Sequence, residues 1–82
     1  MDNRQKLRDL LMDVLLLTEQ EFSLDLRREQ VETWDSLAIV ALAAGIDETF
    51  GYHLTSDEAV RLTGVRDIMR ILEREGIGFA EA

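Results

Sequence analysis

Few side chains in this 82-residue sequence suit covalent chemistry, and the serine at position 36 is the most informative of them. It stands in the tripeptide Asp35-Ser36-Leu37, which follows an irregular stretch and comes directly before a long apolar segment. The tripeptide alone also fits an ordinary helix start, because Asp and Ser are both preferred N-cap residues. A serine hydroxyl is a poor nucleophile unless a base activates it, and nothing near Ser36 in the sequence would do so.

The remaining chemistry-bearing residues argue against an enzyme. The sequence has no cysteine and one histidine, His53, so neither a nucleophilic triad nor a metal site can be assembled persuasively. The pair Asp57-Glu58 reads as favourable charge at a helix N-terminus. Together with Asp47 and Glu48 it lacks the spacing of an EF-hand loop. We therefore predict a protein with no catalytic residues and no metal site.

The charge balance restricts the class of partner. Nine basic residues against seventeen acidic ones give a net charge of −8, which makes nucleic acid an unfavourable partner. Between Glu29 and Val60 the sequence contains no Lys or Arg but seven acidic residues. Two interpretations stay open at this point. The acidic stretch is either a solvated surface that keeps the protein soluble, or a docking face for basic partner proteins.

Helical periodicity dominates the chain and predicts an all-α fold. Proline is absent, which favours helices. We expect one domain over residues 1–82, built as a small four-helix bundle of three main helices and one short one. The expected helices cover about 3–17, 35 or 36–50, 55–62 and 65–75.

The segments between these helices also carry expectations. Residues 18–33 form a long loop between the first two helices, and a loop of this length in a compact domain is often functional. Trp34 ends the loop as an anchor that packs on the core. Gly51 is the expected stop of the second helix, and the tail 77–82 is expected to be frayed.

The helix expected over 36–50 is apolar nearly all round, since Leu37 to Ile46 contains no charged or polar side chain. Such a helix is central, or it offers one face to something outside the domain. Its residues divide into two stripes. One stripe is expected in the core: Ile39, Leu42, Ala43, Ile46 and Phe50. The other is rotated away from it: Leu37, Val40, Ala41 and Ala44.

In this context the serine tripeptide resembles the motif of the acyl carrier protein family. The resemblance rests on four segments: Trp34-Asp-Ser-Leu-Ala-Ile-Val-Ala-Leu, Ile46-Asp-Glu-Thr-Phe-Gly, Leu54-Thr-Ser-Asp-Glu-Ala and Leu62-Thr-Gly-Val-Arg-Asp-Ile. It implies that Ser36 receives a 4′-phosphopantetheine arm from coenzyme A. The base and the magnesium would come largely from a phosphopantetheinyl transferase, with Asp35 and Leu37 flanking the attachment site and Asp35 a candidate magnesium ligand.

The same resemblance implies a docking surface on a protein that catalyses nothing itself. Leu37, Val40 and Ala44 would form its apolar patch. Asp47, Glu48, Asp57 and Glu58 would form ion pairs at the rim. The implied partners are the transferase, acyl or aminoacyl ligases or transferases, and downstream synthases with basic docking surfaces. The protein itself is expected to be a cytoplasmic monomer, and its longest uncharged apolar run is too short to span a bilayer.

Two departures from the family pattern restrict the kind of pathway that we expect this protein to serve. Carriers of primary fatty-acid synthesis usually have acidic residues where this chain has Ala38 and Ala41, and commonly Leu-Gly-x where it has Glu32-Thr33-Trp34. We therefore expect a dedicated pathway making a polyketide, a lipopeptide or a specialised lipid. The alternatives are an aminoacyl or peptidyl carrier protein, or an unmodified helical interaction module that uses the same surface for docking.

Overall fold

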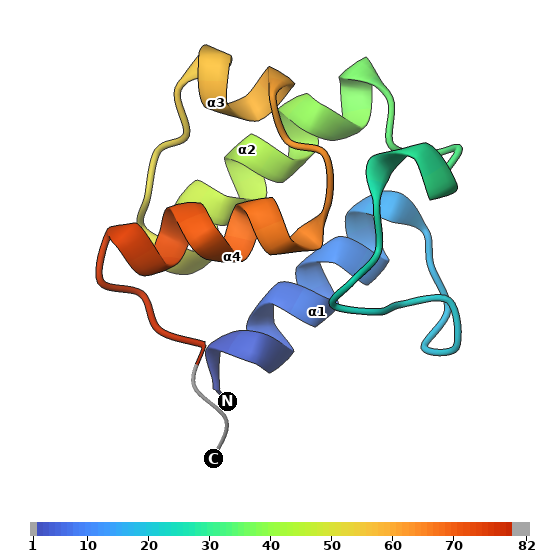
Figure 1. The fold of residues 1–82 in the computed structure, drawn as a ribbon, viewed down its shortest axis with the longest axis horizontal. Helices are drawn as coiled ribbons and strands as arrows, with labels where there is room; N and C mark the ends of the chain where they lie inside the picture. The colour runs from blue at the N-terminus through green and yellow to red at the C-terminus, as the bar shows by residue number, and fades with distance from the viewer. Residues whose placement is uncertain (1, 80–82) are drawn as a thin grey trace.

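The computed structural model describes residues 2–79, and these form helices joined by turns (Figure 1). An isolated bridge between Arg27 and Gly64 is the only β-type pairing within 2–79. The elements in chain order are α1 (Asn3–Leu15), the short 3-10 helix η1 (Arg28–Gln30), α2 (Ser36–Phe50), α3 (Ser56–Val60) and α4 (Val65–Arg74). The predicted all-α bundle with a short third helix and a long first loop is therefore confirmed.

The first helix ends two residues earlier than its periodicity predicts. Its N-cap is Asp2, whose carboxylate accepts a hydrogen bond from the Gln5 N–H at 2.8 Å. At the other end, Leu16 takes a left-handed conformation, with φ 57° and ψ 45°, and its N–H bonds to the Met12 carbonyl. The Thr33 hydroxyl donates to the Leu15 carbonyl at 2.6 Å. In a longer helix the Leu15 carbonyl would accept a hydrogen bond from an N–H of the next turn. Here it accepts one from Thr33 instead, 18 positions further along the chain.

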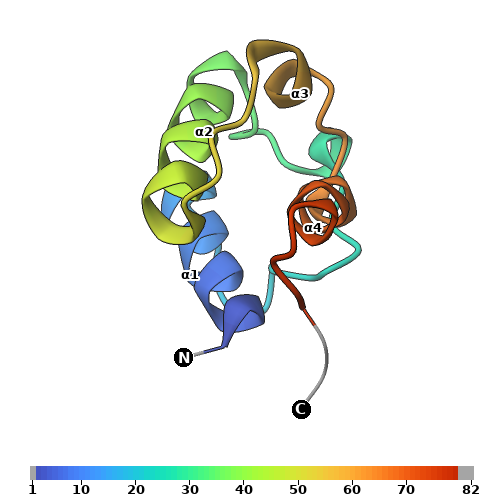
Figure 2. The ribbon, with the colours of Figure 1, turned by 90° about the vertical axis from the view of Figure 1, so that its left-hand side faces the viewer.

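Helices α1 and α2 are antiparallel neighbours. Leu15 lies close to the start of α2 through its bond with Thr33, while Leu10 contacts Gly45 further along α2. A β-carbon at Gly45 would lie 2.4 Å from a methyl carbon of Leu10, so the glycine allows this close approach. The predicted tight packing at Gly45 is thus present, and its partner is a side chain of α1. Figure 2 shows α4 across the molecule from this pair, with α3 closing the top.

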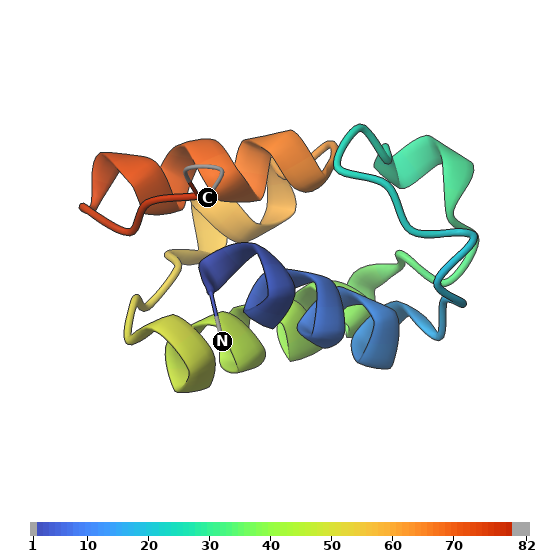
Figure 3. The same cartoon turned by 90° about the horizontal axis from the view of Figure 1, so that it is seen from below.

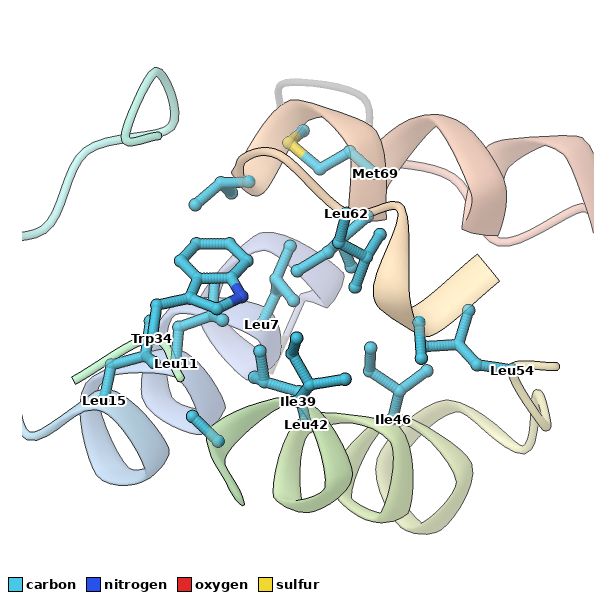
Figure 4. Close-up of a cluster of buried hydrophobic side chains, with 14 of the residues drawn as sticks. Leu7, Leu11, Leu15, Trp34, Ile39, Leu42, Ile46, Leu54, Leu62 and Met69 are labelled. Atoms are coloured by element: carbon cyan, nitrogen blue, oxygen red, sulfur yellow. The ribbon is translucent and has the colours of Figure 1, made fainter. Parts of the chain in front are cut away.

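The core fills the space between the α1–α2 pair and α4. Along α2 the buried residues are Ala38, Ile39, Leu42 and Ile46. Figure 4 shows three of these pointing toward side chains from α1 and toward Leu62, which lies in the connection between α3 and α4. The indole of Trp34 is 3% exposed and lies beside Leu11 and Leu15, which confirms its role as a loop anchor. The indole N–H is buried and has no hydrogen-bond partner within residues 2–79, which costs free energy. Burial of the apolar ring favours folding and offsets this cost.

The long loop is fastened to the connection between α3 and α4. The Arg28 N–H donates to the Thr63 carbonyl at 2.8 Å, and the Val65 N–H donates to the Leu26 carbonyl at 3.0 Å. Between these two bonds a β-carbon on Gly64 would lie 2.8 Å from the Leu26 oxygen. Figure 3 shows the loop reaching the start of α4. Backbone pairing, in addition to apolar contacts, therefore holds the loop in place.

The described part of the tail is packed, which corrects the expectation of fraying for residues 77–79. The Asn3 amide donates to the Gly78 carbonyl at 2.8 Å. Phe79 is buried, and its ring meets that of Phe50 edge to face at 5.9 Å. The contact buries apolar area that outweighs the ordering of a few residues. Residues 80–82 lie outside the described part of the chain.

No helix within residues 2–79 is both long enough and apolar enough to cross a membrane.

Candidate functional site

The serine of the tripeptide is the first residue of α2. Asp35 is the N-cap, and its carboxylate accepts a hydrogen bond from the Ala38 N–H at 3.0 Å. Its carbonyl accepts the first helical bond, from the Ile39 N–H at 3.0 Å. Ser36 therefore has no part in the cap, and its side chain is exposed to solvent. The buried Trp34 fixes the chain immediately before this turn.

This position suits the attachment of a phosphodiester. The first N–H groups of a helix lack intrahelical partners, and the helix dipole places partial positive charge there. Asp35 uses only the Ala38 N–H, so Ser36 and Leu37 present theirs at the helix start. An anion bonded to the Ser36 oxygen would meet favourable electrostatics without rearrangement of the cap. The arrangement fits the 4′-phosphopantetheine group that the sequence resemblance implies at Ser36, between Asp35 and Leu37.

Among residues 2–79 the Ser36 hydroxyl has no hydrogen-bond partner. His53, the one histidine, follows the opposite end of α2, where its Nδ1 lies 3.3 Å from the Asp47 carboxylate. Helix α2 has 15 residues and is therefore about 22 Å long. Within residues 2–79 no group of three or more His, Asp or Glu side chains is arranged to hold a metal ion.

The outer face of α2 carries the apolar residues that the sequence assigned to a partner surface. Leu37 is 81% exposed and Val40 is 68% exposed, and Ala41 and Ala44 are exposed with them. Ala38 and Ala41 stand where the family pattern has acidic residues. Ala38 is buried, so only Ala41 is an exposed position of α2 at which that acidic charge is missing. The two predicted stripes of the helix are therefore real: one packs in the core and the other faces solvent.

The four candidate rim carboxylates differ in how many hydrogen-bond or ion-pair partners they already have within the fold. Glu48 is exposed and has no hydrogen-bond or ion-pair partner in the described chain. Asp47 lies beside His53, and Asp57 is 3.7 Å from the guanidinium of Arg61, a loose and exposed pair. Exposed pairs of this kind contribute little to stability and can exchange partners readily.

The fourth carboxylate, Glu58, is already used inside the fold. It accepts hydrogen bonds from the Thr55 N–H at 3.0 Å, from the Tyr52 hydroxyl at 2.8 Å and from Arg74 at 2.6 Å. The bond from the Thr55 backbone is the largest cause that lowers the pKa of Glu58 to about 2. The same network raises the pKa of Tyr52 and of Arg74 through their hydrogen bonds to Glu58. Its three bonds make Glu58 the least available of the four for a partner, and its docking role stays a prediction.

One exposed residue near the site was missed by the sequence reasoning. Leu16 was expected to lie within the first helix, but it follows the last turn of α1 and is 78% exposed. The signal that could have found it is the unbroken run Leu15-Leu16-Leu17, since one face of a helix cannot bury three consecutive residues.

Fold and site together define a small acidic helical domain that presents a serine at the N-terminus of an exposed helix. Comparison with curated proteins finds a similar chain, the acyl carrier protein of Coprothermobacter proteolyticus, at 26% identity over 69 residues, which is 84% of each chain. This relative supports the resemblance to the acyl carrier protein family that the motif and its context indicate. No family model matches the chain, and no solved structure matches it significantly.

Proposed function

We propose that this protein is an acyl carrier protein that holds intermediates as thioesters on a 4′-phosphopantetheine arm attached to Ser36. The observation that carries the proposal is the position of the Asp35-Ser36-Leu37 motif. It coincides with the exposed start of α2, and Asp35 alone forms the cap. The named relative adds independent support, because its similarity extends over most of the chain.

The residues of this chain would bind partner enzymes and would present and orient the arm, and they would catalyse no step. Attachment exchanges the O–H bond of Ser36 for an O–P bond, while the nucleotide part of coenzyme A leaves and a base on the transferase takes the proton. When attached, the arm supplies the thiol that this cysteine-free chain lacks. Asp35 holds the first turn of α2 through its Oδ1. In this proposal its carboxylate also contributes a magnesium ligand during transfer.

The partners follow from the surface around Ser36. They are a phosphopantetheinyl transferase, acyl or aminoacyl ligases or transferases, and downstream synthases, each with a basic docking surface. Leu37, Val40 and Ala44 supply apolar contact, and the exposed carboxylates supply charge attraction that speeds and orients encounters. The protein acts as a monomer in the cytoplasm. Because Ala41 leaves the middle of this face uncharged, these partners belong to a dedicated pathway making a polyketide, a lipopeptide or a specialised lipid.

Two other functions compete with this proposal. An aminoacyl or peptidyl carrier would have the same arm on Ser36 and differ only in its cargo. An interaction module would use the outer face of α2 without modification, since exposed apolar patches rimmed by polar residues mark docking sites.

The deciding experiment is the intact mass of the protein after incubation with coenzyme A, magnesium and a broad-specificity phosphopantetheinyl transferase. We expect one added arm on the wild type and none on Ser36→Ala. The alanine variant should stay folded with a loss of stability below about 0.5 kcal/mol, because Asp35 forms the cap. An unmodified wild type, tested again with a transferase from the native host, would favour the interaction module. Cargo supplied by candidate ligases would then separate an acyl carrier from an aminoacyl carrier.

A further inference from the structure

Leu16 combines an unusual backbone conformation for a leucine with an exposed apolar side chain. It is the one residue other than glycine with a positive φ in the described chain, at 57°. It is also among the most exposed large apolar side chains, at 78%. A β-carbon makes the left-handed conformation unfavourable, and glycine or asparagine commonly takes such a position after a helix. The left-handed turn ends α1 and is closed by the Leu17 N–H, which donates to the Met12 carbonyl at 3.0 Å, but neither this turn nor the core requires a leucine side chain at position 16.

The position of Leu16 points to the modification site. The Thr33 hydroxyl bonds to the carbonyl of Leu15, so the end of α1 is fixed against the segment that leads into α2. Thr33 is three residues before Ser36, a stretch that spans at most about 11 Å. Figures 1 and 3 both show the end of α1 and the start of α2 on the same side of the molecule. A protein that reaches Ser36 from this side can therefore also contact the end of α1.

The charges around Leu16 and Leu37 indicate the chemistry of that protein. Glu32 and Asp35 are exposed on the segment between the two leucines, and neither forms an ion pair. Other acidic side chains of the loop are paired, Glu19 with Arg8 at 2.9 Å and Glu29 with Arg27 at 2.9 Å. The guanidinium of Arg28 is also used inside the fold, where it donates to the Trp34 carbonyl at 3.2 Å. Two exposed leucines with unneutralised carboxylates between them complement an apolar hollow flanked by lysine or arginine.

We propose that Leu16 is a docking residue for the phosphopantetheinyl transferase, which receives it in an apolar hollow with a basic rim as it brings coenzyme A to Ser36. This inference rests on the proposed function and adds a contact from α1 to the surface on α2. The left-handed backbone turns the side chain of Leu16 outward, away from the core that Leu15 occupies. Conformational strain is thus retained at a position where a partner uses the side chain.

The test separates stability from docking through three substitutions at one position. Leu16→Gly and Leu16→Asn both relieve the backbone strain and remove the apolar contact, whereas Leu16→Met keeps an apolar side chain. Initial rates of arm transfer from coenzyme A by a broad-specificity transferase give kcat and KM for each variant, and circular dichroism gives Tm. Val60→Ser is the control, because Val60 is 59% exposed on α3 beside Arg27, Arg28 and Thr63.

We expect Leu16→Gly and Leu16→Asn to unfold at the same temperature as the wild type or about 4 °C higher. Their kcat/KM should fall about tenfold, mainly through KM, since an apolar contact formed on docking is lost. Leu16→Met and Val60→Ser should stay within about twofold of the wild type. A Leu16→Gly variant that is modified as fast as the wild type overturns the inference and leaves the proposed function standing. A wild type that no transferase modifies overturns both.

Discussion

The outer face of α2 is mostly apolar with a few carboxylates at its end, whereas the side of the molecule formed by α3 and α4 carries many charges that pair with one another. On α3 and α4 the arginines are paired: Arg66 with Asp25 at 3.0 Å, Arg70 with Asp67 at 3.2 Å, and Arg74 with Glu58 at 2.6 Å. The outer face of α2 has no Lys or Arg, and Glu48 on it is unpaired.

The difference shows which region holds the chain together and which is free for a partner. The pairs of Arg66 and Arg74 join segments 41 and 16 residues apart. The backbone bonds of the long loop reach the same region. The outer face of α2 makes no comparable contacts, so changes there should alter docking and leave folding intact. Changes around α3 and α4 should lower the stability of the fold and leave docking largely unchanged.

The largest expected effect on stability comes from closing the space at Gly64. Gly64→Ala would place a carbon 2.8 Å from the Leu26 carbonyl oxygen, and backbone atoms would have to move to make room. We expect a loss of about 2 kcal/mol in the free energy of unfolding, measured by urea denaturation. Gly78→Ala is the matched control, because a β-carbon there meets nothing within 4 Å. Equal stability of the two variants would show that the loop is not held where the structure places it.

A charge reversal on each side tests the comparison directly. Glu48→Lys and Glu73→Lys change the net charge equally, both lie in the last turn of a helix, and both residues are exposed and unpaired. We expect Glu48→Lys to slow association with a phosphopantetheinyl transferase about fivefold at low salt, and the effect to shrink as salt is added. Glu73→Lys should change the rate less than about twofold. Stopped-flow rates that fall equally in both variants would mean that only net charge matters.

The smallest expected effect is a pH dependence of stability from Glu58. Its folded pKa of about 2 lies below the ordinary value of 4.5, so its contribution is present above pH 4.5 and is lost as the pH falls toward 2. Glu58→Gln should therefore flatten the decline of unfolding free energy between pH 4.5 and 2, measured by urea denaturation at several pH values.

Tyr52→Phe provides the matched control for this prediction. It removes one hydrogen bond to the Glu58 carboxylate and should raise the pKa of Glu58, so that the decline is smaller and is complete at a higher pH. A decline identical in wild type and Glu58→Gln would assign it to other carboxylates. Asp67 is the first to consider, because a hydrogen bond from the Thr63 side chain lowers its pKa.

Helix positions, the buried face of α2 and the anchor at Trp34 were predictable because they depend on local periodicity and caps. What the sequence did not reveal depends on contacts between distant residues. The end of α1 is fastened by a hydrogen bond from Thr33 to the Leu15 carbonyl, across 18 positions. Phe79 packs on Phe50, although the tail has no periodicity of its own. The motif at Ser36 was predictable because one short segment contains both the serine and its cap. The hydrogen bonds of Glu58 to Tyr52 and Arg74 were not, because they join α3 to the segment before it and to α4.

The bond between the side chain of Asn3 and the carbonyl of Gly78 has a practical consequence for engineering. It holds the two ends of the described chain together. Helix α1, with 13 residues and a length of about 20 Å, separates them from the end that presents Ser36. An affinity handle, a fused catalytic domain or a biosensor surface could therefore be joined through either terminus without obstructing the serine. A circularly permuted chain could join these ends with a short linker and open elsewhere.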